Sequence, residues 1–209
     1  MICGTYGQYN WHLRHVLDVI GLKEGVRDAS AMSVLIMPSG TFFLCDTHVT
    51  PDPSAEELVE MTLLSADVIR DFGVTPKVAL LSHSSFGTSD TASARKVREA
   101  VGLLSIRAPD LEVDGEMQGD AAMDEALRER IFPNSRLSGQ ANLFVMPNLD
   151  AANCAFTLLA TIGKGLPVGP ILVGAAKPVH ILIPSVTARG IVNMSAVAVV
   201  NAQSADTST

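Results

Sequence analysis

Aromatic residues make up only 5% of this 209-residue chain and charged residues only 18%, whereas 47% of the residues are hydrophobic. A chain with so little charge is expected to bury part of its surface against a partner. The formal net charge is −7 and no basic stripe is present, which argues against a nucleic-acid-binding protein. No uninterrupted apolar run is long enough to cross a bilayer, so we expect no contact with a membrane.

Cysteine is also scarce. The three cysteines Cys3, Cys45 and Cys154 lie far apart and are odd in number, so neither a disulfide framework nor a metal-binding spacing is predicted. Buried thiols in a reducing compartment are the simplest interpretation. The first residues lack a basic segment followed by an apolar one, so we expect no signal peptide and a cytoplasmic protein.

Short apolar segments alternate with helical patterns along most of the chain. Strands are predicted at residues 78–81, 111–113, 143–146, 171–174 and 179–182, and helices at residues 91–106, 119–131, 149–162 and 186–200. Such alternation is typical of parallel βαβ units. The fold class is therefore α/β, with a parallel sheet between two layers of helices.

The first 75 residues add a helix, a hairpin and a second helix. Apolar residues at helical spacing predict a helix over residues 9–20, and Pro38-Ser39-Gly40 joins two short apolar runs that read as a β-hairpin. Ser54 and Glu57 form a capping box that opens a helix ending near Phe72. The polar tail at residues 201–209 is predicted to be disordered.

Polar residues follow three of the predicted strands, at the edge where parallel sheets bind ligands. Ser82, Ser84 and Thr88 could form an anion cradle with backbone N–H groups, or could equally cap an ordinary loop. Asn148 and Asn153 could contact a ligand in the crevice, or Asn148 could simply be a helix N-cap.

Carboxylates and histidines give weaker signals. Asp114, Glu116 and Asp120 could serve as acid, base or metal ligands, although hydrogen bonding within their own loop is the better interpretation. The five histidines show no metal spacing, so no metal site is predicted. Arg14 could bind a phosphate or form a surface salt bridge.

A set of short motifs resembles the phosphotransacetylase family, and most closely the phosphotransacetylase-like C-terminal domain of bacterial NADP-dependent malic enzymes. The motifs span residues 3 to about 200, and they are specific only as a set. They read Cys3-Gly-Thr, Asp46-Thr-His-Val, Ser82-His-Ser-Ser-Phe-Gly, Glu112-Val-Asp-Gly-Glu-Met, Phe132-Pro-Asn-Ser-Arg-Leu, Ala175-Ala-Lys-Pro-Val-His and Ile191-Val-Asn-Met.

The resemblance implies that the catalytic residues of this family are missing. Phosphotransacetylases move an acetyl group between acetyl phosphate and coenzyme A with a Ser, an Arg and an Asp. Alignment on Lys177-Pro-Val places these positions at Ile183, Pro184 and Gly190. None of these residues has a side chain that can donate a hydrogen bond, carry a charge or accept a proton. Arg14 matches an arginine that the family uses for phosphate or coenzyme A contact.

The resemblance further implies two lobes separated by a cleft, with the N-terminal lobe truncated. Residues 1–25 and 171–200 are expected to form part of lobe I, and residues 26–170 lobe II. NADP and a divalent metal are expected only in the absent N-terminal part of the parent enzyme. The expected partners are that part of the parent enzyme and a second copy of the chain.

The predicted function is therefore acetyl-CoA sensing and oligomerisation without acetyl transfer. An active phosphate acetyltransferase is the alternative, in which Ser84, Thr88 or Asp114 has taken over the chemistry. A purely structural oligomerisation domain is a third interpretation.

Overall fold

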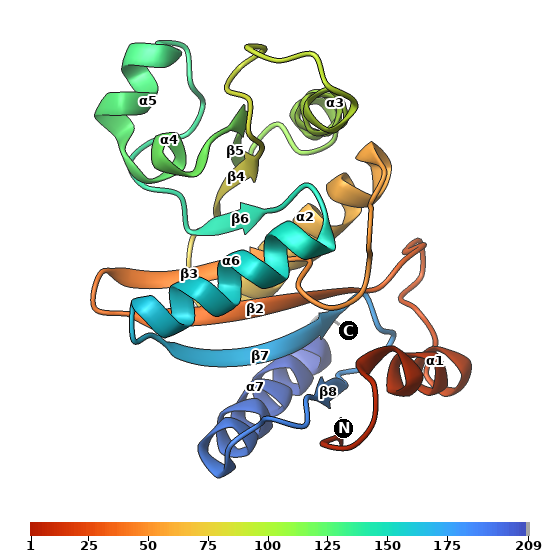
Figure 1. The fold of residues 1–209 in the computed structure, drawn as a ribbon. Coiled ribbons are helices and arrows are strands. Elements are labelled where there is room, and N and C mark those ends of the chain that lie inside the picture. The colour runs from red at the N-terminus through yellow and green to blue at the C-terminus, as the bar shows by residue number, and fades with distance from the viewer. Residues whose placement is uncertain (208–209) are drawn as a thin grey trace.

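A six-stranded sheet forms the centre of the computed structural model, which describes residues 1–207 (Figure 1). Its strand order is β5-β4-β6-β3-β2-β7. The strands are β2 (Ser30–Met37), β3 (Gly40–Cys45), β4 (Lys77–Leu81), β5 (Glu112–Met117), β6 (Leu143–Val145) and β7 (Leu166–Val173).

The sheet is mixed rather than parallel, which corrects the prediction. Strands β3, β6, β4 and β5 pair in parallel, whereas β2 is antiparallel to both β3 and β7. Consequently β2 alone runs against the other five strands. The reason is the predicted hairpin, which is confirmed: Met37 pairs with Gly40, whose φ of 142° favours glycine at the turn.

Strand β7 is longer than predicted. Pro167, Gly169 and Pro170 indicate a break in the sequence, but β7 lies at the sheet edge, where a missing N–H donor is tolerated. Its residues 171–173 pair with β2 in the large sheet, so the chain leaves that sheet after β7.

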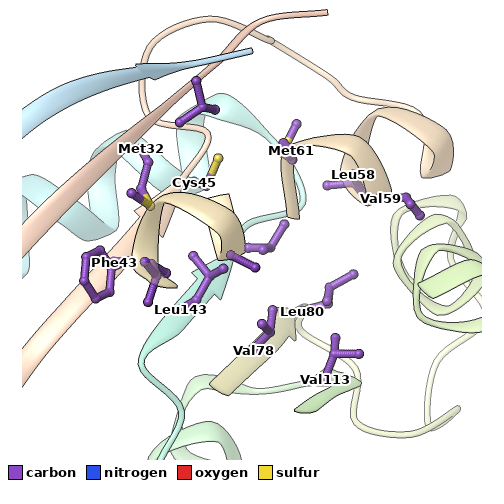
Figure 2. Close-up of a cluster of buried hydrophobic side chains, with 14 of the residues drawn as sticks. Met32, Phe43, Cys45, Leu58, Val59, Met61, Val78, Leu80, Val113 and Leu143 are labelled. Carbon is purple, nitrogen blue, oxygen red and sulfur yellow. The ribbon is translucent and has the colours of Figure 1, made fainter. Parts of the chain in front are cut away.

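Helices cover both faces of the large sheet, as the three-layer prediction requires (Figure 1). On one face lie α2 (Ala55–Asp71), α3 (Ala92–Arg107) and α7 (Ala188–Thr207), and on the other lie α4 (Gly119–Met123) and α6 (Leu149–Ile162). The core between α2, α3 and the strands is apolar, with Met32, Phe43, Leu58 and Leu143 among its fully buried side chains (Figure 2).

A second, two-stranded parallel sheet joins the first strand of the chain to the last one. It pairs β1 (Ile2–Gly4) with β8 (His180–Leu182), and α1 (Tyr9–Val19) packs against it through Leu13 and Val16. Gly4 is required here, because a Cβ atom at this residue would lie 2.3 Å from the Leu182 carbonyl oxygen. The division of the whole chain into two lobes stays a prediction.

Local signals placed most helix ends correctly. Ser54 and Glu57 form both hydrogen bonds of the predicted capping box at the start of α2. The helix predicted over residues 119–131 is instead divided into α4 and α5 (Glu125–Ile131), because Asp124 accepts a hydrogen bond from the Leu127 amide and caps a new helix.

The prediction of a disordered tail is wrong for residues 201–207, which continue α7. Asn201 explains part of this order, because its Oδ1 lies 3.1 Å from the Nε2 atom of buried His180. Residues 208 and 209 lie outside the described part of the chain. Within residues 1–207, no helix combines the length and apolarity that crossing a membrane requires.

A fully buried arginine, Arg128 on α5, holds the loop beside β5. Its guanidinium donates to the carbonyl oxygens of Ala121, Leu137 and Gly139 at 2.7–2.9 Å. No carboxylate accepts from it among the described residues, so three backbone carbonyls alone compensate this charge.

We therefore expect Arg128→Ala to lower the free energy of unfolding by at least about 3 kcal/mol, because three buried carbonyls lose their donors. Urea unfolding followed by circular dichroism measures the change. Arg130→Ala, at an exposed site on the same helix, is the matched control and should stay within about 0.5 kcal/mol of the unchanged chain. A loss below about 1 kcal/mol in Arg128→Ala would contradict this role.

Candidate functional site

Four parallel strands, β3, β6, β4 and β5, end at one edge of the large sheet. Asp46, Met146, Ser82 and Gln118 are the first residues beyond them. Hydrogen bonds continue between the strand ends, from the Met146 amide to the Cys45 carbonyl and from the Ser82 amide to the Met117 carbonyl. This carboxyl edge is where ligands bind in open α/β sheets.

The loop after β3 is built around the buried carboxylate of Asp46. Its oxygens accept four backbone N–H groups, from Ala31, His48, Val49 and Thr50, at 2.8–3.2 Å. Burial raises the pKa of Asp46 more than these hydrogen bonds lower it. Asp46 is not among the predicted site residues, although an Asp directly after a strand is a turn-forming signal.

Helix α1 closes one side of this edge. The Tyr9 ring lies 5.1 Å from the His48 ring, whose Nδ1 atom is 2.9 Å from Thr47 Oγ1. Burial lowers the pKa of His48 to about 4, so its imidazole is neutral at pH 7. Burial also raises the pKa of Tyr9, and its hydroxyl has no hydrogen-bond partner among the described residues.

The loop after β4 is held by the carboxylate of Glu116, which is fully buried on β5. Ser84 Oγ donates to it at 2.8 Å and the Gly87 amide at 2.9 Å. Arg98 on α3 forms two hydrogen bonds with it, both at 3.1 Å. Burial raises the pKa of Glu116, but Arg98, Gly87 and Ser84 outweigh burial and leave the pKa below its ordinary value.

The serine and threonine candidates form hydrogen bonds within the protein. Ser84 is buried and its hydroxyl is committed to Glu116. The Ser82 hydroxyl accepts from the Ser84 amide, and the exposed Thr88 hydroxyl accepts from the Ser85 amide. The hydroxyls of Ser82 and Thr88 accept in these bonds and can still donate to an anion, so ligand contact by these two residues stays a prediction.

The two asparagine candidates connect α6 to the same edge. Asn148 is the N-cap of α6, which confirms the capping alternative, because its Oδ1 accepts from the Ala151 amide at 2.9 Å. Asn153 is exposed and donates from Nδ2 to the Thr47 carbonyl at 3.3 Å. Both residues therefore support the loops that follow β6 and β3.

The three positions that the resemblance matches to the family's catalytic residues lie after β8. Ile183 is half-buried directly beyond this strand, Pro184 is exposed, and Gly190 lies in the first turn of α7. Because β1 and β8 are parallel, the C-terminal ends of both strands lie at the same edge of the small sheet. The Thr5 amide donates to the Leu182 carbonyl there at 3.1 Å.

The edge of the small sheet lies close to the edge of the large one. Tyr9, which contacts His48, follows Thr5 by four positions, and Thr5 comes directly after β1. Such a segment spans at most about 14 Å. Helix α1 therefore starts where the two edges meet, and it carries Arg14, which is exposed and has no partner among residues 1–207.

A hollow of about 390 Å³ lies elsewhere, between α2, α7 and the segment that joins β7 to β8. None of the sequence-predicted site residues lines it. No group of three His, Cys, Asp or Glu side chains in the described part of the chain is arranged to hold a metal ion. The carboxylates of residues 114–120 are partly structural: Asp114 accepts from Ser135 Oγ and from the Arg136 amide.

Comparison with known proteins confirms the resemblance. The family model of phosphate acetyl/butaryl transferases matches residues 1–199. The chain is 54% identical to an NAD-dependent malic enzyme of Rhizobium meliloti, over 96% of the chain but 26% of that enzyme. It is 52% identical to an NADP-dependent malic enzyme of Escherichia coli, over 97% of the chain and 27% of that enzyme. The matched region is the C-terminal part of these enzymes.

Solved structures agree with the sequence relatives. The EutD phosphotransacetylase from Staphylococcus aureus superposes with a TM-score of 0.88 at 32% identity, over 96% of this chain and 62% of that one. A phosphotransacetylase from Streptococcus pyogenes gives 0.92 at 31% identity, over 98% and 63%. The chain thus spans about a quarter of the malic enzymes and under two thirds of the phosphotransacetylases that it matches.

The Glu116 network predicts a pH-dependent stability. Because the pKa of Glu116 is lower in the folded state, its contribution is fully present above the unfolded pKa of about 4.3 and is lost as the pH falls through the folded value. Glu116→Gln should therefore cost about 2–4 kcal/mol at pH 7 and progressively less below pH of about 4. Urea unfolding across this range measures the difference.

Glu99→Gln on α3 is the control, since Glu99 is exposed and next to Arg98 in the sequence. It should leave the stability nearly unchanged at every pH. A Glu116→Gln cost that stays constant between pH 7 and the acid end would show that the charge of Glu116 does not stabilise this loop.

Proposed function

Because this chain belongs to the phosphate acetyl/butaryl transferase family, we propose that it binds acetyl-CoA without turning it over. In this proposal it is a regulatory and oligomerisation module of a larger malic-enzyme polypeptide. NADP and a divalent metal would bind the other part of that polypeptide. The observation that carries the proposal is a family fold, over the part that this chain covers, with three apolar or side-chain-free residues at the positions matched to the family's catalytic residues.

The loss of chemistry follows from the side chains after β8. Acetyl transfer between phosphate and a thiol needs a base for the thiol and donors for the developing negative charge. Ile183, Pro184 and Gly190 supply neither. Residues of this kind act as a unit, so the loss of all three removes most of the rate.

The alternative of an active transferase needs substitutes, and the structure leaves few free. The hydroxyl of Ser84 is buried and donates to Glu116. The carboxylate of Asp114 is buried and accepts from Ser135 and Arg136. Of the three residues considered as replacements, only Thr88 is exposed, and a hydroxyl without an adjacent base is a weak nucleophile.

One feature of helix α1 supports the binding part of the proposal. Helix α1 starts close to the carboxyl edges of both sheets, and Arg14 on this helix is exposed and has no partner among residues 1–207. A guanidinium can bind a phosphate through two parallel hydrogen bonds. In a chain of net charge −7, such a local cation is needed to attract a polyanion such as acetyl-CoA.

An exposed apolar surface supports the oligomerisation part of the proposal. Helix α6 exposes Leu158, Leu159 and Ile162, and Ile162 is 78% exposed. Exposed apolar side chains at this spacing are typical of surfaces that bind protein partners. A second copy of the chain and another part of the parent polypeptide are the candidate partners.

Acetyl-CoA binding and turnover, measured on the same preparation, test the proposal. We expect heat of binding in calorimetry and no formation of acetyl phosphate or acetyl-CoA above background. Arg14→Gln should weaken binding roughly tenfold or more, because a charge-assisted hydrogen bond is lost. Arg130→Gln, an exposed arginine on α5, should leave the affinity unchanged. Robust turnover by the unchanged chain would refute the proposal.

Restoring the family residues tests the cause of inactivity. The variant Ile183→Ser, Pro184→Arg, Gly190→Asp should gain measurable acetyl transfer. A Cβ atom at Gly190 would lie 2.8 Å from Val186 Cγ2, so Val186→Ala is added to make room. Val186→Ala alone is the control and should remain inactive. Equal rates in both variants would show that the lost chemistry does not depend on these positions.

A further inference from the structure

Met1 lies beside the hollow between α2, α7 and the segment that joins β7 to β8. Its amino group donates to the Pro178 carbonyl at 2.7 Å, and Pro178 is one of the residues that line the hollow. The His180 amide donates in turn to the Met1 carbonyl at 3.0 Å. Residues that precede Met1 in a longer polypeptide would therefore begin beside this hollow.

The pairing between β1 and β8 is interrupted directly before Met1. Ile2 lies opposite His180, so the same register would place the residue before Met1 opposite Pro178. Proline has no N–H group, so the parallel ladder lacks a donor at this position. We therefore expect a preceding chain to leave the small sheet at Pro178, where the hollow opens.

The hollow combines apolar walls with charged residues. Leu64 and Val68 of α2 line it and are half-buried. Lys23, Asp71 and Lys177 also line it, are exposed, and form no ion pair among residues 1–207. Its volume of about 390 Å³ is large enough for several side chains. Apolar walls beside unpaired charges of both signs suit a polypeptide segment, which can offer apolar, acidic and basic groups together.

A buried histidine of the hollow has an unused hydrogen-bonding atom. His180 is 1% exposed, and its Nε2 atom lies 3.1 Å from Asn201 Oδ1. Burial lowers the pKa of His180 to about 4, so the ring is neutral at pH 7. Because Nε2 donates to Asn201, Nδ1 is an acceptor, and it has no partner in the described part of the chain. Water or a further polypeptide segment can supply the missing donor.

We infer that this hollow is the docking site of the segment that directly precedes Met1 in the parent malic-enzyme polypeptide. The inference rests on the proposed function, in which the chain is part of such a polypeptide. The chain covers 26% and 27% of the two malic enzymes compared above, and it matches their C-terminal part. The remainder would therefore reach this chain through the residues before Met1. Ten residues span at most about 35 Å, which is ample to cross the hollow.

Thiol labelling tests the docking. Ala176→Cys places a thiol on the wall of the hollow, and the exposed Cys154 on α6 is a control within the same molecule. Three forms are compared: this chain, the chain extended by about ten residues of the parent polypeptide, and the whole parent polypeptide. Peptide mass spectrometry then gives the labelling rate of each thiol separately.

We expect labelling at residue 176 to slow roughly tenfold in both longer forms, because a segment that is docked about nine-tenths of the time leaves this thiol open for about a tenth of it. Cys154 should react at the same rate in the chain and in the extended chain. Equal rates at residue 176 in all three forms would refute the docking.

A blocking variant tests whether the protection comes from the hollow itself. Val68→Glu puts a carboxylate on its apolar wall and should restore fast labelling of residue 176 in the extended chain. Leu63→Glu, at a half-buried residue of α2 outside the residues that line the hollow, is the matched control and should keep the protection. Equal loss of protection in both variants would contradict docking at this site.

The remaining outcomes identify other occupants. Protection in the whole parent polypeptide but not in the extended chain would assign the hollow to a more distant part of that polypeptide. Protection that rises with the concentration of the unextended chain would assign it to a second copy. Either result refutes the inference. None of these measurements reads acetyl-CoA binding, so their failure leaves the proposed sensor in place, whereas calorimetry without heat of binding refutes the sensor and leaves the docking.

Discussion

The carboxylate of Asp46 is the constraint on which the geometry of the carboxyl edge of the large sheet depends. It is buried at the end of β3 and accepts four backbone N–H groups, one from β2 and three from the loop that follows β3. These bonds fix the direction in which the chain leaves the large sheet and present His48 to Tyr9 at the start of α1. The neutral side chain of an asparagine has only one acceptor oxygen. This turn therefore depends on a carboxylate, which accepts hydrogen bonds through two oxygens.

A division between scaffold and chemistry follows from this geometry. Buried acids, Asp46, Asp114 and Glu116, hold the loops at the carboxyl edge, and their hydrogen bonds are directed inward. The segment after β8, which the resemblance matches to the family's catalytic residues, has no ionisable side chain at the three matched positions. A protein can lose catalysis in this way and keep binding, because the two functions are carried by different segments.

Local chemistry explains which parts of the fold were predictable. The hairpin turn, the Ser54 capping box and the Asn148 N-cap depend on residues a few positions apart, and the structure confirms each. The antiparallel place of β7, the buried charge of Arg128 and the pairing of Glu116 with Arg98 depend on residues distant in sequence or on tertiary packing. Periodicity carries no information about such partners. The resemblance located the candidate catalytic positions, which no local pattern marks.

A crystal structure of the chain determined with acetyl-CoA is the most direct test of the central claim. We predict an intact thioester, with the acetyl end beside Ile183. A structure without bound acetyl-CoA at a saturating concentration would contradict binding. Free coenzyme A, or an acetyl group attached to the protein, would contradict the loss of chemistry.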